Sequence, residues 1–289
     1  MMAAKRAAHN AGETARDAAT NPWTIRLARC GFATKGIVYL LIGILAAKAA
    51  VGAGGKTTDN RGAIETLYRQ PFGRALVSLI ALGLFVYALW LFVAAALDPE
   101  RTGTDAKGAA GARWAGRAVS AMLGCTYAAL GVVAAKLVVQ QRSSGKGTDA
   151  ATHDWTAKLL AHPFGAALVV LIGLIVLGVA GYFFFQAATA RFRDKLDLGG
   201  ASAAERGWVG PLGRVGFAAL GVVDVIIGLF LIIAAVRHNA GETKGVGSAL
   251  AAVAQRPYGG VLLGVVALGF IAYAAYTFAE ARYRRLVAG

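Results

Sequence analysis

The chain has 289 residues, of which 57% are hydrophobic and only 16% are charged. Soluble domains have about 45–50% apolar and about 25% charged residues, so this composition excludes an ordinary soluble globule. Lysine and arginine number 30 against 15 acidic residues, which gives a net charge of +15. The basic residues gather at the ends of apolar blocks, so they indicate anionic lipid headgroups as partners and argue against nucleic acid.

Six apolar blocks follow one another along the chain. Each is near or above the roughly 20 residues that cross the hydrocarbon core as a helix, a length that excludes strands. The expected spans are residues 30–51, 72–97, 118–139, 164–190, 215–236 and 258–280. The predicted fold class is therefore all-α, a polytopic membrane protein with six transmembrane helices.

Charge sets the expected orientation. Residues 1–25 are predicted to form a flexible cytoplasmic tail, and residues 1–28 contain no apolar stretch that would form a signal peptide. Six spans place both termini on one side, where the connecting segments carry 17 lysines and arginines against 12 on the other side. This excess favours cytoplasmic termini.

One short motif opens the second span of three tandem helical hairpins. It reads Pro71-Phe72-Gly73, then Pro163-Phe164-Gly165, then Pro257-Tyr258-Gly259. Proline suits the start of a helix, because its missing N–H would have no partner there. The repeats comprise residues 26–100, 113–195 and 208–286, and together they form one membrane domain.

The first spans of the three hairpins also align, from Arg29, Arg117 and Arg214. Seven and fourteen residues after each arginine stand six glycines: Gly36, Gly43, Gly124, Gly131, Gly221 and Gly228. Glycines allow close backbone approach, which favours helix association in lipid. We expect a packing seam, and the alternative is the lining of a pore or ligand site.

Aromatic residues recur in the second spans. Phe72, Phe164 and Tyr258 precede Trp90, Tyr182 and Tyr276 by 18 residues, about 27 Å along a helix. This distance is close to the hydrocarbon thickness, so all six residues are predicted to form belts at the two interfaces.

Successive two-span repeats enter the membrane from the same side, so a rotation about the membrane normal should relate them. The expected shape has pseudo-threefold symmetry around an axis that either carries a pore or is closed by packing. A short surface helix is expected in each hairpin loop, over residues 63–70, 155–162 and 249–256.

The chain resembles the bacterial integral membrane family known as domain of unknown function 1206. The resemblance rests on the three hairpins with their Pro-Phe/Tyr-Gly opening and on the arginine followed by glycine, tyrosine and glycine at offsets 7, 10 and 14. The resemblance covers about residues 26–286. It implies a six-span protein of the bacterial cytoplasmic (inner) membrane and brings no established activity or catalytic residue. The chain departs from its own repeat at Asp224, where the other copies have Tyr39 and Tyr127.

Two charged residues are expected inside the membrane. Asp224 lies ten residues, about 15 Å, beyond Arg214, which is near the bilayer centre. It is either an ion or proton site or a polar lock hydrogen-bonded to Tyr39 or Tyr127. Lys35 stands six residues beyond Arg29, and it either pairs with Asp224 or extends along the helix to the interface. The C-terminal Arg282, Arg284 and Arg285 are predicted to touch anionic lipid.

Metal and redox chemistry have weak support. His153, His162 and His238 share one side of the membrane with Asp59, Asp149 and Asp154, and a zinc site there is one alternative. Their spacing fits no helix-borne motif, so surface histidines, no metal and no cofactor are expected. Cys30 and Cys125 form neither a disulfide framework nor a metal spacing.

Enzymatic signatures are missing from the sequence, which has no phosphate-binding loop, no nucleophile elbow and no His-Glu-x-x-His motif. The leading hypothesis is a non-catalytic integral membrane protein with a structural or binding role toward another membrane protein or lipid. The alternative is an ion, proton or small-solute pathway along the pseudo-threefold axis that uses Asp224.

Overall fold

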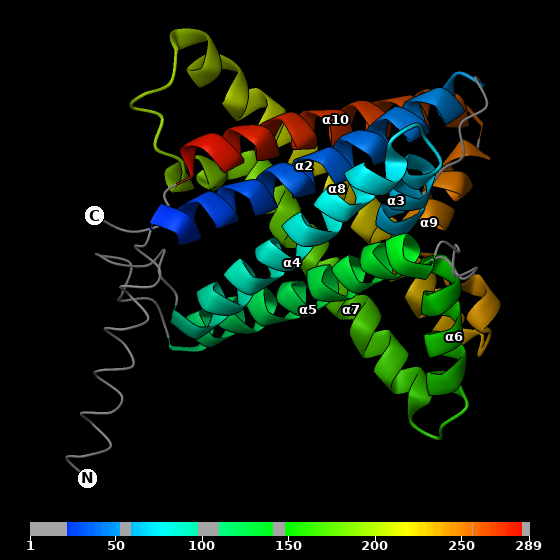
Figure 1. Cartoon of the computed structure of the whole chain (residues 1–289). Coiled ribbons are helices and arrows are strands. Elements are labelled where there is room, and N and C mark those ends of the chain that lie inside the picture. Colours follow the sequence, from blue (N-terminus) through cyan, green and yellow to red (C-terminus); the bar gives the residue numbers. More distant parts are fainter. Residues whose placement is uncertain (1–21, 53–58, 98–109, 141–147, 256, 285–289) are drawn as a thin grey trace.

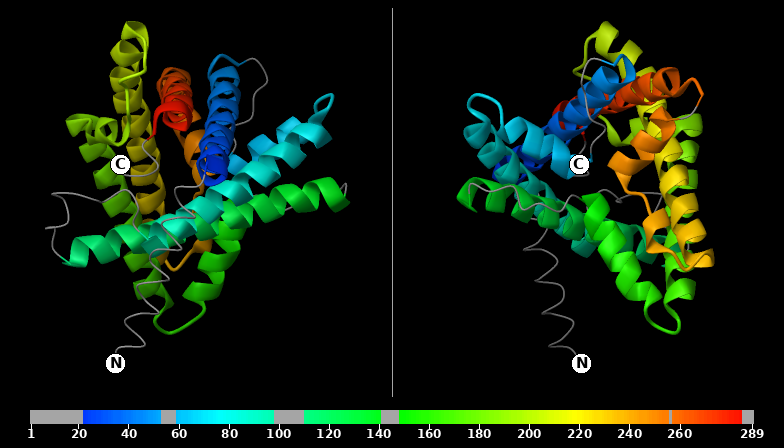
Figure 2. Two further views of the ribbon diagram at one scale, coloured as in Figure 1. Left: turned by 60° about the vertical axis from the view of Figure 1, so that its left-hand side comes forward. Right: turned by 90° about the vertical axis from the view of Figure 1, so that its right-hand side faces the viewer.

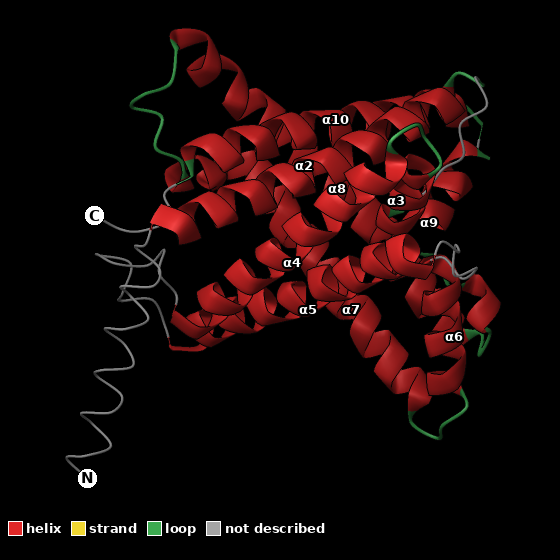
Figure 3. Ribbon diagram, viewed as in Figure 1, coloured by secondary structure: helices red, strands yellow, loops and turns green. Residues whose placement is uncertain are grey.

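The computed structural model describes residues 22–52, 59–97, 110–140, 148–255 and 257–284. Every regular element within these residues is a helix (Figure 3). A single antiparallel bridge between Leu196 and Arg284 ties the end of the second repeat to the end of the third. The predicted all-helical class is therefore confirmed.

Six helices are long and apolar enough to cross a membrane. They are α2 (Pro22–Ala50), α4 (Gly73–Leu97), α5 (Ala110–Gln140), α7 (Gly165–Thr189), α8 (Ala203–Val236) and α10 (Gly259–Tyr283). The six predicted spans are confirmed, but α2, α5 and α8 begin 8 to 12 residues earlier than expected. Hydropathy marks only the part of a helix that lies in hydrocarbon, whereas the helix continues through polar residues. Most of the predicted tail lies outside the described residues, and its last four residues belong to α2.

The start of α8 shows how such an extension is stabilised. The Ser202 side chain accepts a hydrogen bond from the Glu205 backbone at 3.2 Å, and the Glu205 carboxylate accepts one from the Ser202 backbone at 2.8 Å. This reciprocal capping box satisfies two of the N–H groups that a helix start leaves without partners. The helix therefore begins well before its apolar stretch.

Three short helices lie together at one end of the bundle, at the right of Figure 1: α3 (Asn60–Tyr68), α6 (Thr148–Leu160) and α9 (Val246–Ala254). Each helix begins three to seven residues before the start of the predicted segment and ends two residues before the end of that segment. Two 3₁₀ turns, η2 (Arg191–Lys195) and η3 (Ala240–Glu242), complete the described helices.

The repeated Pro-Phe/Tyr-Gly motif turns the chain from each short helix into the next span. The spans begin at Gly73, Gly165 and Gly259, so each proline stands two residues before its helix and the predicted proline start is wrong. Backbone carbonyls of the preceding short helix press against each of these glycines, where a Cβ would collide with them. The motif therefore makes a tight turn, and the glycine is needed for its close contact.

The most extensive helix packing joins different repeats rather than the two spans of one repeat. The pairs α4 with α5, α7 with α8 and α10 with α2 close a circle from the third repeat back to the first. Figure 2 shows these pairs inclined to one another. Each pair joins the second span of one repeat to the first span of the next, which is the relation that pseudo-threefold symmetry requires.

Repeats 1 and 3 also close their own hairpins, through a glycine on the first span and a tyrosine on the second. A Cβ on Gly31 would stand 2.7 Å from the Tyr87 Cβ, and one on Gly216 would stand 2.6 Å from the Tyr273 Cα. Repeat 2 has Val119 and Val179 at the corresponding positions. A valine in place of the glycine cannot allow this backbone approach, and the described residues of α5 and α7 do not form a packed pair.

A second contact along the hairpins follows the same pattern. Gly83 faces Thr34 in repeat 1 and Gly269 faces Ala219 in repeat 3. Repeat 2 has Met122 and Ile175 at these positions, and both side chains are exposed. Together with Val119 and Val179 they form what we call the unpaired hairpin face. Within the apolar 18-residue stretch of each helix, only 17% of α7 is buried, against 56% of α10. The protein itself therefore leaves most of α7 uncovered.

Candidate functional site

The six predicted glycines lie between neighbouring repeats. Gly36, Gly124 and Gly221 each contact the ring of a phenylalanine on the other helix of their pair, and a Cβ there would stand 2.9 to 3.0 Å from that ring. The rings belong to Phe278, Phe92 and Phe184, which occupy one repeat position, 20 residues after the motif aromatic. Gly43, Gly131 and Gly228, seven residues further along each helix, contact the side chains of Ile271, Phe85 and Leu177. The glycines thus contact protein side chains.

Aromatic rings fill the centre of the bundle. Tyr39 packs edge-on against Tyr273 with ring centroids 4.9 Å apart, and Tyr127 packs edge-on against Tyr87 at 4.7 Å. Phe32 and Phe217 are 2% and 8% exposed and contact the same tyrosines. Edge-to-face pairs of this kind contribute about 0.5–1.5 kcal/mol each beyond the area they bury.

Lys35 directs its ammonium group into this aromatic cluster. Its Nζ lies 5.7 Å from the centre of the Tyr87 ring and 5.1 Å from that of Tyr273, within the range of cation–π attraction. It forms no ion pair with Asp224 among the described residues, so that predicted alternative is wrong. Two tyrosine rings, and no carboxylate, therefore face the ammonium group among the described residues.

Sequence analysis missed Tyr87 and Tyr273. Both lie 15 residues after the motif aromatic of their repeat, and the second repeat has Val179 there. This recurrence was visible in the sequence. Its meaning depends on helix pairing, because these tyrosines contact the first span of their own repeat and that of the next one.

Asp224 is partly exposed and lies within electrostatic range of Tyr39. Its carboxylate forms no hydrogen bond or ion pair with any residue that the structure describes, so the predicted bond to Tyr39 or Tyr127 is not made. In the other two copies, the residue at this position packs against the tyrosine of the preceding repeat. The same register places Val179 opposite Asp224, so an acidic and an aliphatic residue replace the third tyrosine pair.

A second charged cluster lies at the end of α10. Arg284 forms an ion pair with Glu280, and these side chains are only 12% and 6% exposed. The Tyr276 hydroxyl donates to the Glu280 Oε1 at 3.5 Å, and the Arg284 guanidinium lies 4.6 Å from the Phe32 ring centre. The prediction that Arg284 touches lipid is wrong, because this arginine turns inward to a buried carboxylate. Arg282 stays exposed, 3.6 Å from the Glu205 Oε1, and Arg285 lies outside the described residues.

The six aromatic residues that were predicted to form two belts differ in their exposure. Phe72, Phe164 and Tyr258 are 79–87% exposed, as a belt residue must be. Trp90 and Tyr276 are buried to 3% and 1% exposure, so they are core residues and the belt assignment is wrong for both. Tyr182 remains exposed and bonds to Gln186. Helix packing determines which of these aromatic residues are buried, and hydropathy carries no information on that packing.

The loop histidines and acids are used locally. His153 lies 3.7 Å from Asp154, and Asp59 caps α3 by accepting from the Gly62 backbone at 2.8 Å. His162 and His238 are exposed, and the Asp149 side chain lies outside the described residues. Within the described part of the chain, no three histidine, cysteine or acidic side chains gather in a way that could hold a metal ion. Cys30 and Cys125 are exposed free thiols.

Helices, repeats and central charges define a multi-pass membrane protein of three tandem hairpins. The family model described as "Domain of Unknown Function (DUF1206)" matches residues 30–98, 118–190 and 215–284, so the chain belongs to this family. It is similar to a protein of Bacillus subtilis (strain 168) described as "Uncharacterized protein YxxB", with 32% identity over 267 residues that cover 92% of this chain and 94% of the relative. No solved structure matches the chain.

Proposed function

We propose that this protein is a non-catalytic binding protein of the membrane, which holds a partner transmembrane helix carrying a basic residue. The observation behind this proposal is the combination of the unpaired hairpin face in repeat 2 with Asp224 on α8 of repeat 3, the helix that packs against α7. The Asp224 carboxylate has no hydrogen-bonding partner among the described residues. Repeats 1 and 3 form the closed framework, and repeat 2 offers the binding surface.

Charge complementarity supports a basic partner. A carboxylate at this depth is costly, and intramembrane acids usually pair with a basic group. Lys35 does not fill this role, since its ammonium lies between Tyr87 and Tyr273. A lysine or arginine from another helix would neutralise Asp224 where the third tyrosine pair is missing.

The shape of α7 supports a helix as the partner. Gly178 and Gly181 are exposed, and nothing lies within 4 Å of the place where a Cβ would stand. Exposed small residues let a second helix approach closely, and this is the usual source of attraction between helices in lipid. Lipid chains would cover the aliphatic residues equally well, but they offer nothing to Asp224.

The proposal is tested with two synthetic transmembrane peptides, a polyleucine helix with one central lysine and the same helix with leucine there. The full chain carries a donor dye on the exposed Cys125 of α5, with Cys30→Ser removing the other thiol, and energy transfer to labelled peptide is measured in lipid vesicles. An intramembrane polar contact contributes about 1–2 kcal/mol, so the lysine peptide should bind about 5- to 30-fold more tightly.

Asp224→Asn should abolish this preference and leave the leucine peptide unaffected. Equal binding of both peptides to the unmodified chain, or an unchanged preference in Asp224→Asn, would refute the proposal. If only lipid covers the unpaired hairpin face, neither peptide will show energy transfer, and this result would also refute the proposal.

The second candidate is an ion, proton or small-solute pathway that uses Asp224, and the partly exposed carboxylate favours it. Phe32, Phe217 and the four tyrosines that fill the axis count against it. Proton and cation flux into liposomes containing the purified chain distinguishes the two candidates. Flux that disappears in both Asp224→Asn and Asp224→Leu would establish the pathway.

We further propose that the protein resides in the bacterial cytoplasmic (inner) membrane with both termini in the cytoplasm. The excess of basic residues on the side of the termini supports this orientation. Accessibility of single cysteines in the α3 and α9 segments to a membrane-impermeant thiol reagent tests it, because these segments should react from the outer face.

A further inference from the structure

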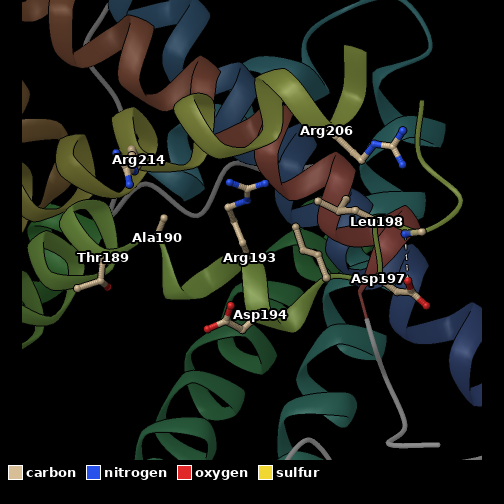
Figure 4. A pocket seen from close by; sticks show the side chains of 10 residues that line it. Thr189, Ala190, Arg193, Asp194, Asp197, Leu198, Arg206 and Arg214 are labelled. Atoms are coloured by element: carbon tan, nitrogen blue, oxygen red, sulfur yellow. Dashed lines mark hydrogen bonds between the residues drawn. The ribbon is translucent and has the colours of Figure 1, made fainter. Parts of the chain in front are cut away.

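A polar recess lies at the side of the bundle where α2 begins and α10 ends. Its volume is about 760 Å³, and the end of α7, the turn η2, residues 196–199 and the first turns of α8 line it. Three arginines face this recess: Arg193 from η2 and Arg206 and Arg214 from α8 (Figure 4). It is separate from the unpaired hairpin face and from the aromatic cluster.

The three arginines gather along one face of α8, two of them on the helix itself and Arg193 on the turn η2 that lies against it. Arg206, Gly210 and Arg214 are spaced four residues apart, so they form a row about 12 Å long on that face. Arg193 lies over the middle of the row, because a Cβ on Gly210 would stand 3.4 Å from its Nη1. The glycine leaves room for the guanidinium between the two helix-borne arginines.

Two carboxylates, Asp194 and Asp197, also line the recess, but neither forms an ion pair with the three arginines. None of the three guanidinium groups forms an ion pair or hydrogen bond with another described residue. Asp197 accepts from the Gly199 backbone at 3.1 Å, and Figure 4 shows the Asp194 carboxylate on the opposite side of η2 from the Arg193 guanidinium. Three like charges held in a row repel one another, so an anion between them is stabilising.

We propose that this recess binds a phosphate group. Guanidinium groups present paired N–H donors that match phosphate oxygens, which makes arginine the preferred residue for such recognition. Arg214 directly precedes the apolar stretch of residues 215–236, so the recess lies at the level of the lipid phosphates. The phosphate comes from an anionic phospholipid headgroup or from a soluble anion, and both have the same chemistry.

The geometry favours the lipid source. Thr189 lines the recess, and the exposed rings of Phe185 and Tyr182 lie one and two turns further along α7 toward the bilayer centre. A phospholipid with its phosphate in the recess would place its acyl chains beside these rings. The other arginine of this turn, Arg191, lies over the Phe185 ring with its Cζ 5.1 Å from the ring centre and does not line the recess.

The experiment titrates the full chain, purified in a neutral detergent, with three separate probes: dioleoylphosphatidylglycerol, dioleoylphosphatidylcholine and inorganic phosphate. Native mass spectrometry measures bound lipid, and thermal unfolding measures stabilisation by inorganic phosphate. The variants are Arg193→Gln, Arg206→Gln, Arg214→Gln and the triple substitution. Arg191→Gln is the matched control, because it removes the same charge from the same turn outside the recess.

We expect phosphatidylglycerol to bind in preference to phosphatidylcholine. Each recess substitution should weaken binding about fivefold and the triple substitution on the order of a hundredfold, while Arg191→Gln should change it by less than about twofold. Gly210→Leu provides a test without any change of charge. Its side chain displaces the Arg193 guanidinium, so it should weaken binding about as much as Arg193→Gln.

The source of the phosphate is read from the same titration. Retention of phosphatidylglycerol without stabilisation by inorganic phosphate supports a lipid headgroup, whereas stabilisation by inorganic phosphate alone supports a soluble anion. Equal binding of the two lipids, or equal losses in Arg191→Gln and the recess variants, would overturn the assignment.

Discussion

A single methyl group at Gly216 should separate two helices of the third repeat. In Gly216→Ala the new Cβ would stand 2.6 Å from the Tyr273 Cα and 2.7 Å from its Cβ, where ordinary contacts measure 3.4–4 Å. The obstructing atoms are backbone and Cβ atoms, which cannot rotate away as the end of a flexible side chain can. Helices α8 and α10 must therefore move apart by about 1 Å.

The cost follows from what Tyr273 holds in place. Its ring packs against Phe217 of α8 and Tyr39 of α2 at centroid distances of 5.4 and 4.9 Å. A gap of about 1 Å forfeits a quarter to a half of each dispersion contact, and aromatic pairs contribute about 0.5–1.5 kcal/mol each. With the strain of overpacking, and a helix-propensity gain of up to about 1 kcal/mol, we expect a net loss of about 2 kcal/mol.

Reversible unfolding in mixed micelles with increasing SDS measures this free energy of unfolding. Gly207→Ala is the control on the same helix, because nothing lies within 4 Å of its Cβ position. It should leave stability unchanged or raise it by up to about 1 kcal/mol. Gly216→Ala as stable as Gly207→Ala would refute the argument that backbone approach closes this hairpin.

Two further predictions concern the charged residues. Lys35→Met should leave the free energy of unfolding within about 1 kcal/mol of its original value, because the lost cation–π attraction to Tyr87 and Tyr273 is offset by no longer burying an ammonium group. A loss above about 3 kcal/mol in the same unfolding assay would contradict this balance. Arg117→Gln should destabilise the end of α4 by about 1–2 kcal/mol, since Arg117 donates from Nε to the Ala95 carbonyl at 2.6 Å and from Nη2 to that of Ala96. Hydrogen exchange of the last turn of α4 measures it, and the prediction fails if the equivalent Arg214→Gln, which breaks no such bond, has an equal effect on the last turn of α7.

The two intramembrane charges show how far the sequence reaches. Their depth follows from counting residues along an apolar helix, and this count places Lys35 one turn from the level of Asp224. The partners of Lys35 do not follow, because Tyr87 reaches it only when α4 packs against α2 and Tyr273 only when α10 of the third repeat packs against α2. The recess lined by Arg193, Arg206 and Arg214 was not predicted for the same reason, since Gly210 and Arg193 are 17 residues apart on different elements.

The sequence alone determined the six spans and the three repeats, because a bilayer requires about 20 apolar residues per helix and this requirement is local to each segment. It also contained the exception, with Val119 and Val179 standing where repeats 1 and 3 have glycine and tyrosine. Only the tertiary structure decided that helices pair mainly between repeats and that the second hairpin stays open. Helix pairing in lipid depends on how closely two particular backbones approach, and hydropathy along one chain carries no record of that distance.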